Sequence, residues 1–444
     1  MTETLCFIAN KNLPIPDEIG SFKQLEELLI SCPQAQNARS KPTKFPALKA
    51  AIDSYETYAT TSGFPEFNFS SDLLPFIIQC ARREQDGHRG FHILKAGYSD
   101  SVSYSAATAV GMLANAFFLN LVSAGRDSVV ASRAPDVGSV DLVGLYSKEN
   151  GPSALIATQR LVCLVSYFHQ CSATQQSVLA SREIIVERLV TKATQSGGIF
   201  DDLALRNKLV KKDACRIYTG SMEESSAGAF VDFANRRLHI HSIIPSCTQE
   251  EVLFTVCPEA YLAILFCETM ADNEAITLRN VKRWCAFSGY GNTFRFTGPY
   301  VPPQGSADAI TVLAIDAVSR DHLGQTSVQR DVRKAYLAFS SVPAGTKIVT
   351  GHWGCGCFGG NKTHKFLQQV CAATMADRFL DYCVYEDAYL ESRFIEILNK
   401  VEEKNMTIAD VYTKLLLVKS KIDYEAFVGR ALGLEGAKRS CILV

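Results

Sequence analysis

The stretch that most constrains the fold is TKIVTGHWGCGCFGGNKTHKFLQQV, which starts at Thr346. A β-type run at residues 347–349 leads into a turn with five glycines, and apolar residues then recur at helical spacing. Glycines let backbone N–H groups approach an anion without interference from a Cβ atom, and the positive end of the following helix lies beneath them. The stretch therefore predicts an α/β fold with a diphosphate-binding loop; the alternative is a tight strand–helix turn without a ligand.

Gly354, Gly356 and Gly359 also satisfy the G-x-G-x-x-G pattern of dinucleotide-binding folds. That fold needs an acidic residue at the end of the next strand. We expect Asp377 and Asp381 inside the following helix and a short strand only at residues 382–385, so the spacing argues against a Rossmann fold.

The chain changes character near residue 215. Residues 71–214 predict a mainly helical region, with an amphipathic helix at 72–84, a long buried helix at 101–125 whose serines suit capping, and a further helix at 154–173. After 215, short β-branched or aromatic runs alternate with helix-length segments, which favours a partly parallel sheet. We therefore divide the chain into an irregular segment (1–70), a helical region (71–214), an α/β domain (215–430) and a tail (431–444).

Two adjacent carboxylates, Glu250 and Glu251, follow the segment VDFANRRLHIHSIIPSCTQ. Neighbouring side chains point in different directions, so one can hold a substrate while the other moves protons. Glycoside cleavage needs such a pair, and burial against the apolar residues 252–254 would raise the pKa of the less solvated acid. The alternative is a helix N-terminus, where acids are favourable in any case. Asp232 and Asn235 could bond ribose hydroxyls or only cap a strand end.

Four segments together resemble the poly(ADP-ribose) glycohydrolase family: VDFANR, QEE at residues 249–251, SGYGNTFRF from Ser288, and GHWGCGCFGG from Gly351. SVSYSAATAVGMLANAFF and QRLVCLVSYF resemble the helical region of that family, so the likeness spans roughly residues 70 to 415. The resemblance implies a macrodomain-like mixed α/β sheet flanked by helices, with a mainly helical N-terminal accessory domain. It also implies an enzyme that hydrolyses ribose–ribose O-glycosidic bonds of poly(ADP-ribose) and releases ADP-ribose, without a cofactor.

The resemblance also implies residue roles. Glu251 would be the general acid that then activates water, and Glu250 would position the scissile ribose beside Asp232 and Asn235. The remaining substrate contacts would come from Gln249, from the backbone of His352, Trp353, Gly354, Cys355, Gly356 and Cys357 around the diphosphate, from Tyr290 near the phosphates, and from Tyr385, Met222 and Glu223 around the adenine.

One departure affects the predicted activity. The family has three consecutive glycines before the glutamates, and this chain has His239, Ile240 and His241 at the same spacing. Residues other than glycine are strained at positive φ, and isoleucine is among the worst. Either the loop takes another path or side chains occupy the ribose space. A second hypothesis is therefore an impaired member that binds ADP-ribose or polymer ends; a third is a dinucleotide-binding enzyme or scaffold of another class.

Other features limit the partners. The formal net charge of −1 gives no reason to expect nucleic-acid binding. The resemblance implies poly(ADP-ribose) or ADP-ribosylated proteins as partners. His239, His241 and Cys247 give no complete metal-ligand set, so we predict no metal. The scattered cysteines suggest a reducing compartment, and we expect no signal peptide or transmembrane helix. Cys441 stands four residues from the end in a C-a-a-X arrangement, so prenylation would add weak membrane association to a nuclear or cytoplasmic location.

Overall fold

The computed structural model describes residues 7–9, 15–87, 90–123, 136–191 and 206–418. The predicted tail at 431–444 and the prenylation site Cys441 lie outside these residues and stay predictions. Within the described residues, no helix has the length and apolar composition needed to cross a membrane.

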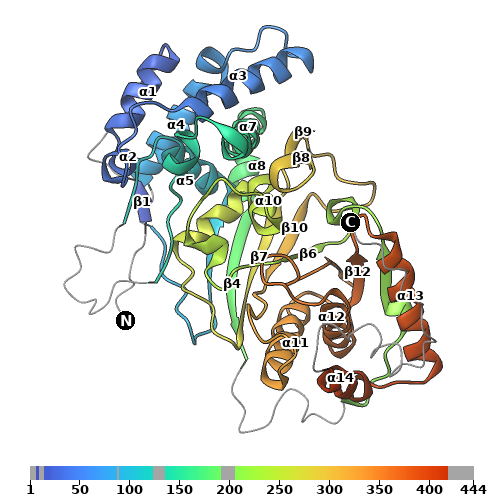
Figure 1. The fold of residues 1–444 in the computed structure, drawn as a ribbon. Helices are drawn as coiled ribbons and strands as arrows, with labels where there is room; N and C mark the ends of the chain where they lie inside the picture. Colours follow the sequence, from blue (N-terminus) through green and yellow to red (C-terminus); the bar gives the residue numbers. More distant parts are fainter. Residues whose placement is uncertain (1–6, 10–14, 88–89, 124–135, 192–205, 419–444) are drawn as a thin grey trace.

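An eight-stranded mixed sheet forms the centre of the molecule (Figure 1). The five strands from β10 to β5 run parallel, while β7, β4 and β2 continue the sheet in antiparallel pairing. In spatial order the strands are β2 (Asp100–Ser105), β4 (Glu183–Val190), β7 (Glu274–Lys282), β10 (Ala309–Ala314), β6 (Ala229–Asp232), β11 (Lys347–Thr350), β12 (Phe379–Cys383) and β5 (Cys215–Tyr218). The predicted mixed α/β sheet is confirmed.

Both faces of the sheet are covered, because successive side chains of a strand point to opposite sides. Phe230 of β6 belongs to the hydrophobic cluster shared with the N-terminal helices, and Val231 belongs to the cluster on the other face. That second face is covered by α11 (Gln325–Ser340), α12 (Lys362–Ala376), α13 (Ala388–Glu403) and α14 (Ile408–Leu417).

The first face carries the N-terminal helices together with α10 (Gln249–Val256) and a 3₁₀ helix, Pro258–Leu265. The helices here are α1 (Phe22–Ser31), α2 (Pro33–Asn37), α3 (Pro46–Thr61), a π-helical turn (Phe69–Leu73), α4 (Leu74–Gly87), α5 (Ala106–Phe117), α6 (Val143–Tyr146), α7 (Gly151–Ser172) and α8 (Gln176–Ser181). Two small antiparallel pairs complete the fold, β1 (Phe7–Ala9) with β3 (Leu121–Ser123) and β8 (Cys285–Ser288) with β9 (Arg295–Pro299).

The helical prediction for residues 101–125 is wrong in its first part, and also after Phe117, where α5 ends and β3 follows at Leu121–Ser123. Val102 and Tyr104 are buried while their neighbours face outward, which is the period of a strand, and β2 forms there. Helix α5 starts only at Ala106, where Ser105 caps it by accepting from the N–H of Thr108 at 3.0 Å. The same alternation in EIIVERLV produces β4, so the sheet takes two strands from the region expected to be helical.

Two further boundaries differ from the prediction. Helix α12 ends at Ala376, because Asp377 adopts the left-handed conformation with φ 54°, and β12 begins at Phe379. Asp381 therefore lies in a strand and not in the helix. The helix-length segment at residues 257–273 forms a short 3₁₀ helix, Pro258–Leu265, and β7 begins at Glu274.

Candidate functional site

The loops that follow the five parallel strands meet at one edge of the sheet, where ligands bind in open α/β folds. Ile348 and Val349 of β11 pair with Ala229 and Phe230 of β6. Continued by two residues, this register brings the start of the glycine loop beside Asp232. A Cβ atom on Gly351 would lie 3.6 Å from the ring of Phe233 and 3.7 Å from Met222 Sδ. The glycine loop and the acidic segment therefore share one edge of the sheet.

Helix α10 begins at the acidic pair and is fixed to the end of β6. Gln249 accepts from the Phe233 N–H at 2.8 Å and donates to the Val231 carbonyl at 3.0 Å. Glu251 closes a capping box, because its carboxylate accepts from both the N–H and the hydroxyl of Thr248. The sequence alternative of a capped helix start is thus also true, and it holds the 5% exposed Glu251 in a defined position.

Glu250 and Asp232 are buried acids with different surroundings. Glu250 accepts from the backbone N–H groups of Asn235, at 3.1 Å, and of His239, so its carboxylate organises the loop between them. Asp232 is fully buried, and in the described part of the chain neither of its carboxylate oxygens has a hydrogen-bond partner. Burial, and then the charge of Glu251, raises the pKa of Asp232 well above its ordinary value. Burial, followed by the charge of Asp232, does the same to the pKa of Glu250.

The segment His239–His241 keeps a glycine-like backbone without glycine. Its φ angles are 52° at His239, 52° at Ile240 and 58° at His241, all in the left-handed region. That conformation costs roughly 1–2 kcal/mol for each residue with a Cβ atom. The three residues therefore take the strained left-handed conformation.

Arg160 of α7 supports this strained loop from the helical side of the molecule. Its buried guanidinium donates to Tyr261 Oη at 2.8 Å, to the Ser246 carbonyl at 3.0 Å and to the Ile244 carbonyl. It also lies 3.3 Å from His239 Nε2. Because His239 Nδ1 donates to the Ser242 carbonyl at 2.7 Å, Nε2 is the acceptor and the ring is neutral.

Both ring nitrogens of His239 are thus engaged, which leaves none for a metal ion. In the described residues no group of three or more histidine, cysteine or acidic side chains is arranged to hold a metal. Burial, followed by the charge of Arg160, lowers the pKa of His239 to about 4. The sequence reasoning gave Arg160 no role; a lone arginine in the apolar helix 154–173 was the available signal.

The glycine loop leaves part of its backbone free. The N–H groups of Trp353, Cys355, Gly359 and Gly360 bond within the loop. Those of Gly356, Cys357 and Phe358 donate to no acceptor among the described residues. Gly354 has φ 72°, and a Cβ atom there would lie 2.5 Å from Ala317 Cβ, so only glycine fits. Asn361 caps the following helix α12 by accepting from the His364 N–H at 3.0 Å.

The side chains of this loop fasten it to the sheet. Trp353 is fully buried and donates from Nε1 to the Ile315 carbonyl at 2.8 Å. Lys365, under the loop, forms a buried ion pair with Asp331 of α11 and lies 4.9 Å from the Trp353 ring centroid. His352 is half-buried, and burial lowers its pKa to about 4. Cys357 is exposed, while Cys355 donates to the Trp353 carbonyl at 3.5 Å.

The residues expected near adenine gather at the ends of β5 and β12. Met222 is buried in the 3₁₀ turn Met222–Glu224, and Tyr290 Oη donates to the Glu223 carboxylate at 3.3 Å. Burial raises the pKa of Glu223. Tyr385 meets Tyr290 edge-on, with ring centroids 5.8 Å apart, and 42% of Tyr385 is exposed. An exposed aromatic face beside a buried carboxylate suits a planar base with amino hydrogens.

Comparison with known proteins matches both parts of the chain to one family. Residues 205–392 match the family model described as poly(ADP-ribose) glycohydrolase, macro domain fold, and residues 65–188 match its helical domain. Two similar proteins are the *Caenorhabditis elegans* poly(ADP-ribose) glycohydrolases 1 and 2. Each is 30% identical, over 44% and 46% of this chain and over 28% and 47% of their own lengths. The matched part of the chain thus spans less than half of either relative.

A solved structure of the *Deinococcus radiodurans* poly(ADP-ribose) glycohydrolase in complex with ADP-ribose is 15% identical, with a TM-score of 0.27. That match covers 45% of this chain and 89% of the other. A TM-score this low supports no inference about this chain.

Proposed function

Because this chain belongs to the poly(ADP-ribose) glycohydrolase family, we propose that it hydrolyses the ribose–ribose O-glycosidic bond of poly(ADP-ribose) and releases ADP-ribose. The observation that carries this proposal is the left-handed backbone at residues 239–241. The chain bears the strain of three non-glycine residues there, and the Glu250 carboxylate holds the loop beside Glu251. Strain of this kind persists where the surrounding structure enforces it, and it clusters at functional sites.

In the proposed reaction Glu251 acts first as an acid. As the bond between C1″ of the distal ribose and the 2′-oxygen of the leaving adenosine breaks, Glu251 gives its proton to that oxygen. The ribose passes through an oxocarbenium-like state. The Glu251 carboxylate then takes a proton from water while the water oxygen bonds to C1″, which returns the acid to its starting form.

Glu250 and Asp232 are proposed to position the ribose. The Glu250 carboxylate fixes the backbone of Asn235 and His239, so both present a constant surface to the sugar. Burial raises the pKa of Asp232 and so favours its protonated form, in which the carboxyl can donate to a ribose hydroxyl. Gln249 acts through the backbone of β6, to which both ends of its amide are bonded.

The diphosphate and the adenine of ADP-ribose are proposed to lie along the same sheet edge, on the side away from β10. The N–H groups of Gly356, Cys357 and Phe358 are proposed to bind the diphosphate. Tyr385 would stack on the adenine, and Glu223 would accept from its amino group. No metal or cofactor enters this scheme.

A second candidate is an impaired family member that binds ADP-ribose without efficient hydrolysis. The observation that favours it is Ile240, whose side chain is half-buried at a position where the family has only a hydrogen atom. This candidate requires the Ile240 side chain to narrow the space available to the ribose, while the glycine loop keeps its capacity to bind the diphosphate.

The test is to incubate the protein with labelled poly(ADP-ribose) and, in parallel, to measure binding of free ADP-ribose. The proposal expects ADP-ribose release by the wild type and a loss of at least about 10³-fold in Glu251→Gln, with ADP-ribose binding retained. The matched control is Glu183→Gln, an exposed carboxylate at the start of β4. If the wild type binds ADP-ribose but releases none from the polymer, the impaired member is supported. If it neither binds nor releases ADP-ribose, both candidate functions are contradicted.

A further inference from the structure

A pocket of about 410 Å³ opens beside the acidic segment. Its walls are Asn235 and Arg236 after β6, residues 316–320 after β10, and Arg330 of α11. Phe358 of the glycine loop also lines it, so the pocket touches both parts of the site described above. A volume of this size is typical of sites for small organic ligands.

The order of strands places the pocket relative to the substrate. Along the carboxyl edge the strands follow each other as β5, β12, β11, β6 and β10. The proposed adenine contacts lie after β5 and β12, the diphosphate loop after β11 and the acids after β6. The pocket lies one strand further on, between β6 and β10, and therefore on the far side of the bond to be cleaved. In the polymer, that side carries the adenosine and diphosphate of the preceding ADP-ribose unit.

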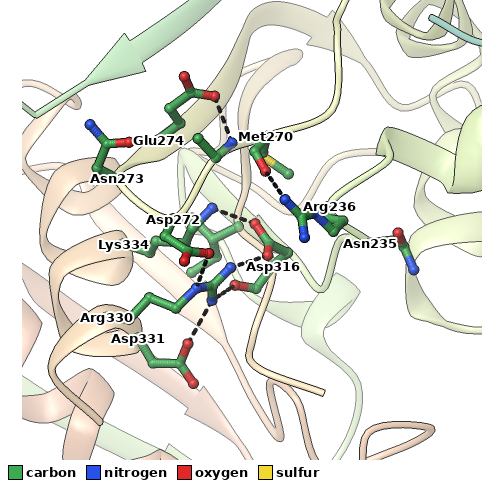
Figure 2. A network of polar contacts seen from close by, with 12 residues as sticks. Asn235, Arg236, Met270, Asp272, Asn273, Glu274, Asp316, Arg330, Asp331 and Lys334 are labelled. Carbon is green, nitrogen blue, oxygen red and sulfur yellow. Dashed lines mark hydrogen bonds and ion pairs between the residues drawn. The ribbon is translucent and has the colours of Figure 1, made fainter. Parts of the chain in front are cut away.

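Two guanidinium groups at the pocket form no close ion pair within the described ranges, although Arg236 helps to lower the pKa of Asp272 after the larger effect of Arg330. Arg236 and Arg320 are exposed and form no ion pair in the described part of the chain. Among the described residues, the Arg236 guanidinium donates to the Met270 carbonyl alone, at 3.4 Å (Figure 2). Guanidinium groups recognise phosphate oxygens through paired N–H donors. Two such groups at one rim suit a ligand with two negative charges.

The floor of the pocket is rigid. Arg330 is held by three carboxylates, those of Asp272, Asp316 and Asp331 (Figure 2). Lys334 pairs with the same Asp316. Lys365 pairs with Asp331, so three cations balance the three carboxylates and the floor contributes little net charge. Arg236 and Arg320 therefore decide which ligand the pocket attracts.

We propose that this pocket binds the leaving side of the substrate, namely the diphosphate of the ADP-ribose unit that precedes the scissile bond. The inference rests on the proposed function for the direction of the chain along the sheet edge. The pocket makes the protein prefer a polymer or a dimer over a single ADP-ribose group attached to a neutral leaving group.

The experiment uses the full chain in the Glu251→Gln background, so that an ADP-ribose dimer with a ribose–ribose bond stays intact. Affinities for ADP-ribose and for the dimer are measured by calorimetry. We expect the dimer to bind about ten-fold more tightly than ADP-ribose, with an advantage that shrinks as salt is raised. The double variant Arg236→Glu/Arg320→Glu should remove that advantage and keep the affinity for ADP-ribose within about two-fold. The double variant Arg39→Glu/Lys41→Glu, at two exposed positions between α2 and α3, is the matched charge control.

Equal affinities for dimer and monomer with the pocket intact would overturn the inference, and so would an advantage that survives the double variant. Wild-type turnover is measured separately. A protein that binds the dimer through the pocket but releases no ADP-ribose would contradict the proposed hydrolysis alone, and a protein that binds neither ligand would contradict both.

Discussion

Ile240 offers a direct test of the strained loop. At φ 52° and ψ 20°, a residue with a Cβ atom pays roughly 1–2 kcal/mol that glycine does not pay. Glycine also gives the unfolded chain more conformational freedom than alanine does, which lowers the free energy of unfolding by about 0.4–1 kcal/mol. Ile240→Gly should therefore be more stable than Ile240→Ala by about 0.5–1 kcal/mol. At ordinary negative φ the order is reversed.

The comparison of glycine with alanine isolates the backbone effect, because both variants remove nearly the same side chain. Stability is measured by urea denaturation followed through tryptophan fluorescence. The two tryptophans of the chain, Trp284 and Trp353, are both buried in the folded state. The slope of the free energy with urea should be the same in both variants. An Ile240→Ala protein that is as stable as Ile240→Gly, or more stable, would refute the left-handed assignment.

Turnover of the same variants separates the two candidate functions. If the isoleucine side chain limits access of the ribose, Ile240→Gly hydrolyses poly(ADP-ribose) faster than wild type. If the loop already fits the substrate, turnover stays the same or falls.

Three further predictions concern the support of the site. Arg160→Lys should lower the free energy of unfolding by about 2–3 kcal/mol in the same urea titration, because one ammonium cannot replace the several donors of the guanidinium; wild-type stability would contradict this. The pKa of His239 is about 4 in the folded protein and near 6.5 in the unfolded chain. The neutral ring therefore contributes fully to the free energy of unfolding above pH 6.5. This contribution, up to about 3 kcal/mol, is lost as the pH falls toward 4. His239→Asn should therefore flatten the dependence of stability on pH in that window by up to about 1.4 kcal/mol per pH unit, and an unchanged slope would show that another group titrates. Gly354→Ala should lower the free energy of unfolding by about 2 kcal/mol or more and weaken ADP-ribose binding, since its Cβ would lie 2.5 Å from Ala317 Cβ. Gly356→Ala has open space around it and should stay within about 1 kcal/mol of wild type. Equal stabilities of the two variants would argue against the loop geometry.

The parallel half of the sheet was predictable, because residues after 215 carry their own local signals. Glycines mark the loop after β11, and the acids at 250 and 251 stand at a capped helix start. The capping box itself follows from Thr248 and Glu251 at the required spacing. What joins these pieces is strand pairing, and the register of β6 against β11 is a long-range property that no local pattern specifies.

The strand β2 was missed for a different reason. Its alternation of serine with Val102 and Tyr104 runs directly into the helical pattern of α5, and the window that detects a helix covers both. The role of Arg160 was not predictable from spacing, because its acceptors lie 79 to 101 residues further along the chain. Only the folded structure brings the buried arginine to the loop it supports.

The central sheet takes strands from both matched regions of the chain, and this limits where the protein can be truncated. A fragment that begins at residue 215 would lose β2 and β4, expose the edge of β7, and remove the helix that carries Arg160. The two matched family regions are thus not separable modules, and a substitution of Arg160 in α7 can alter the loop at His239, 79 residues further along the sequence.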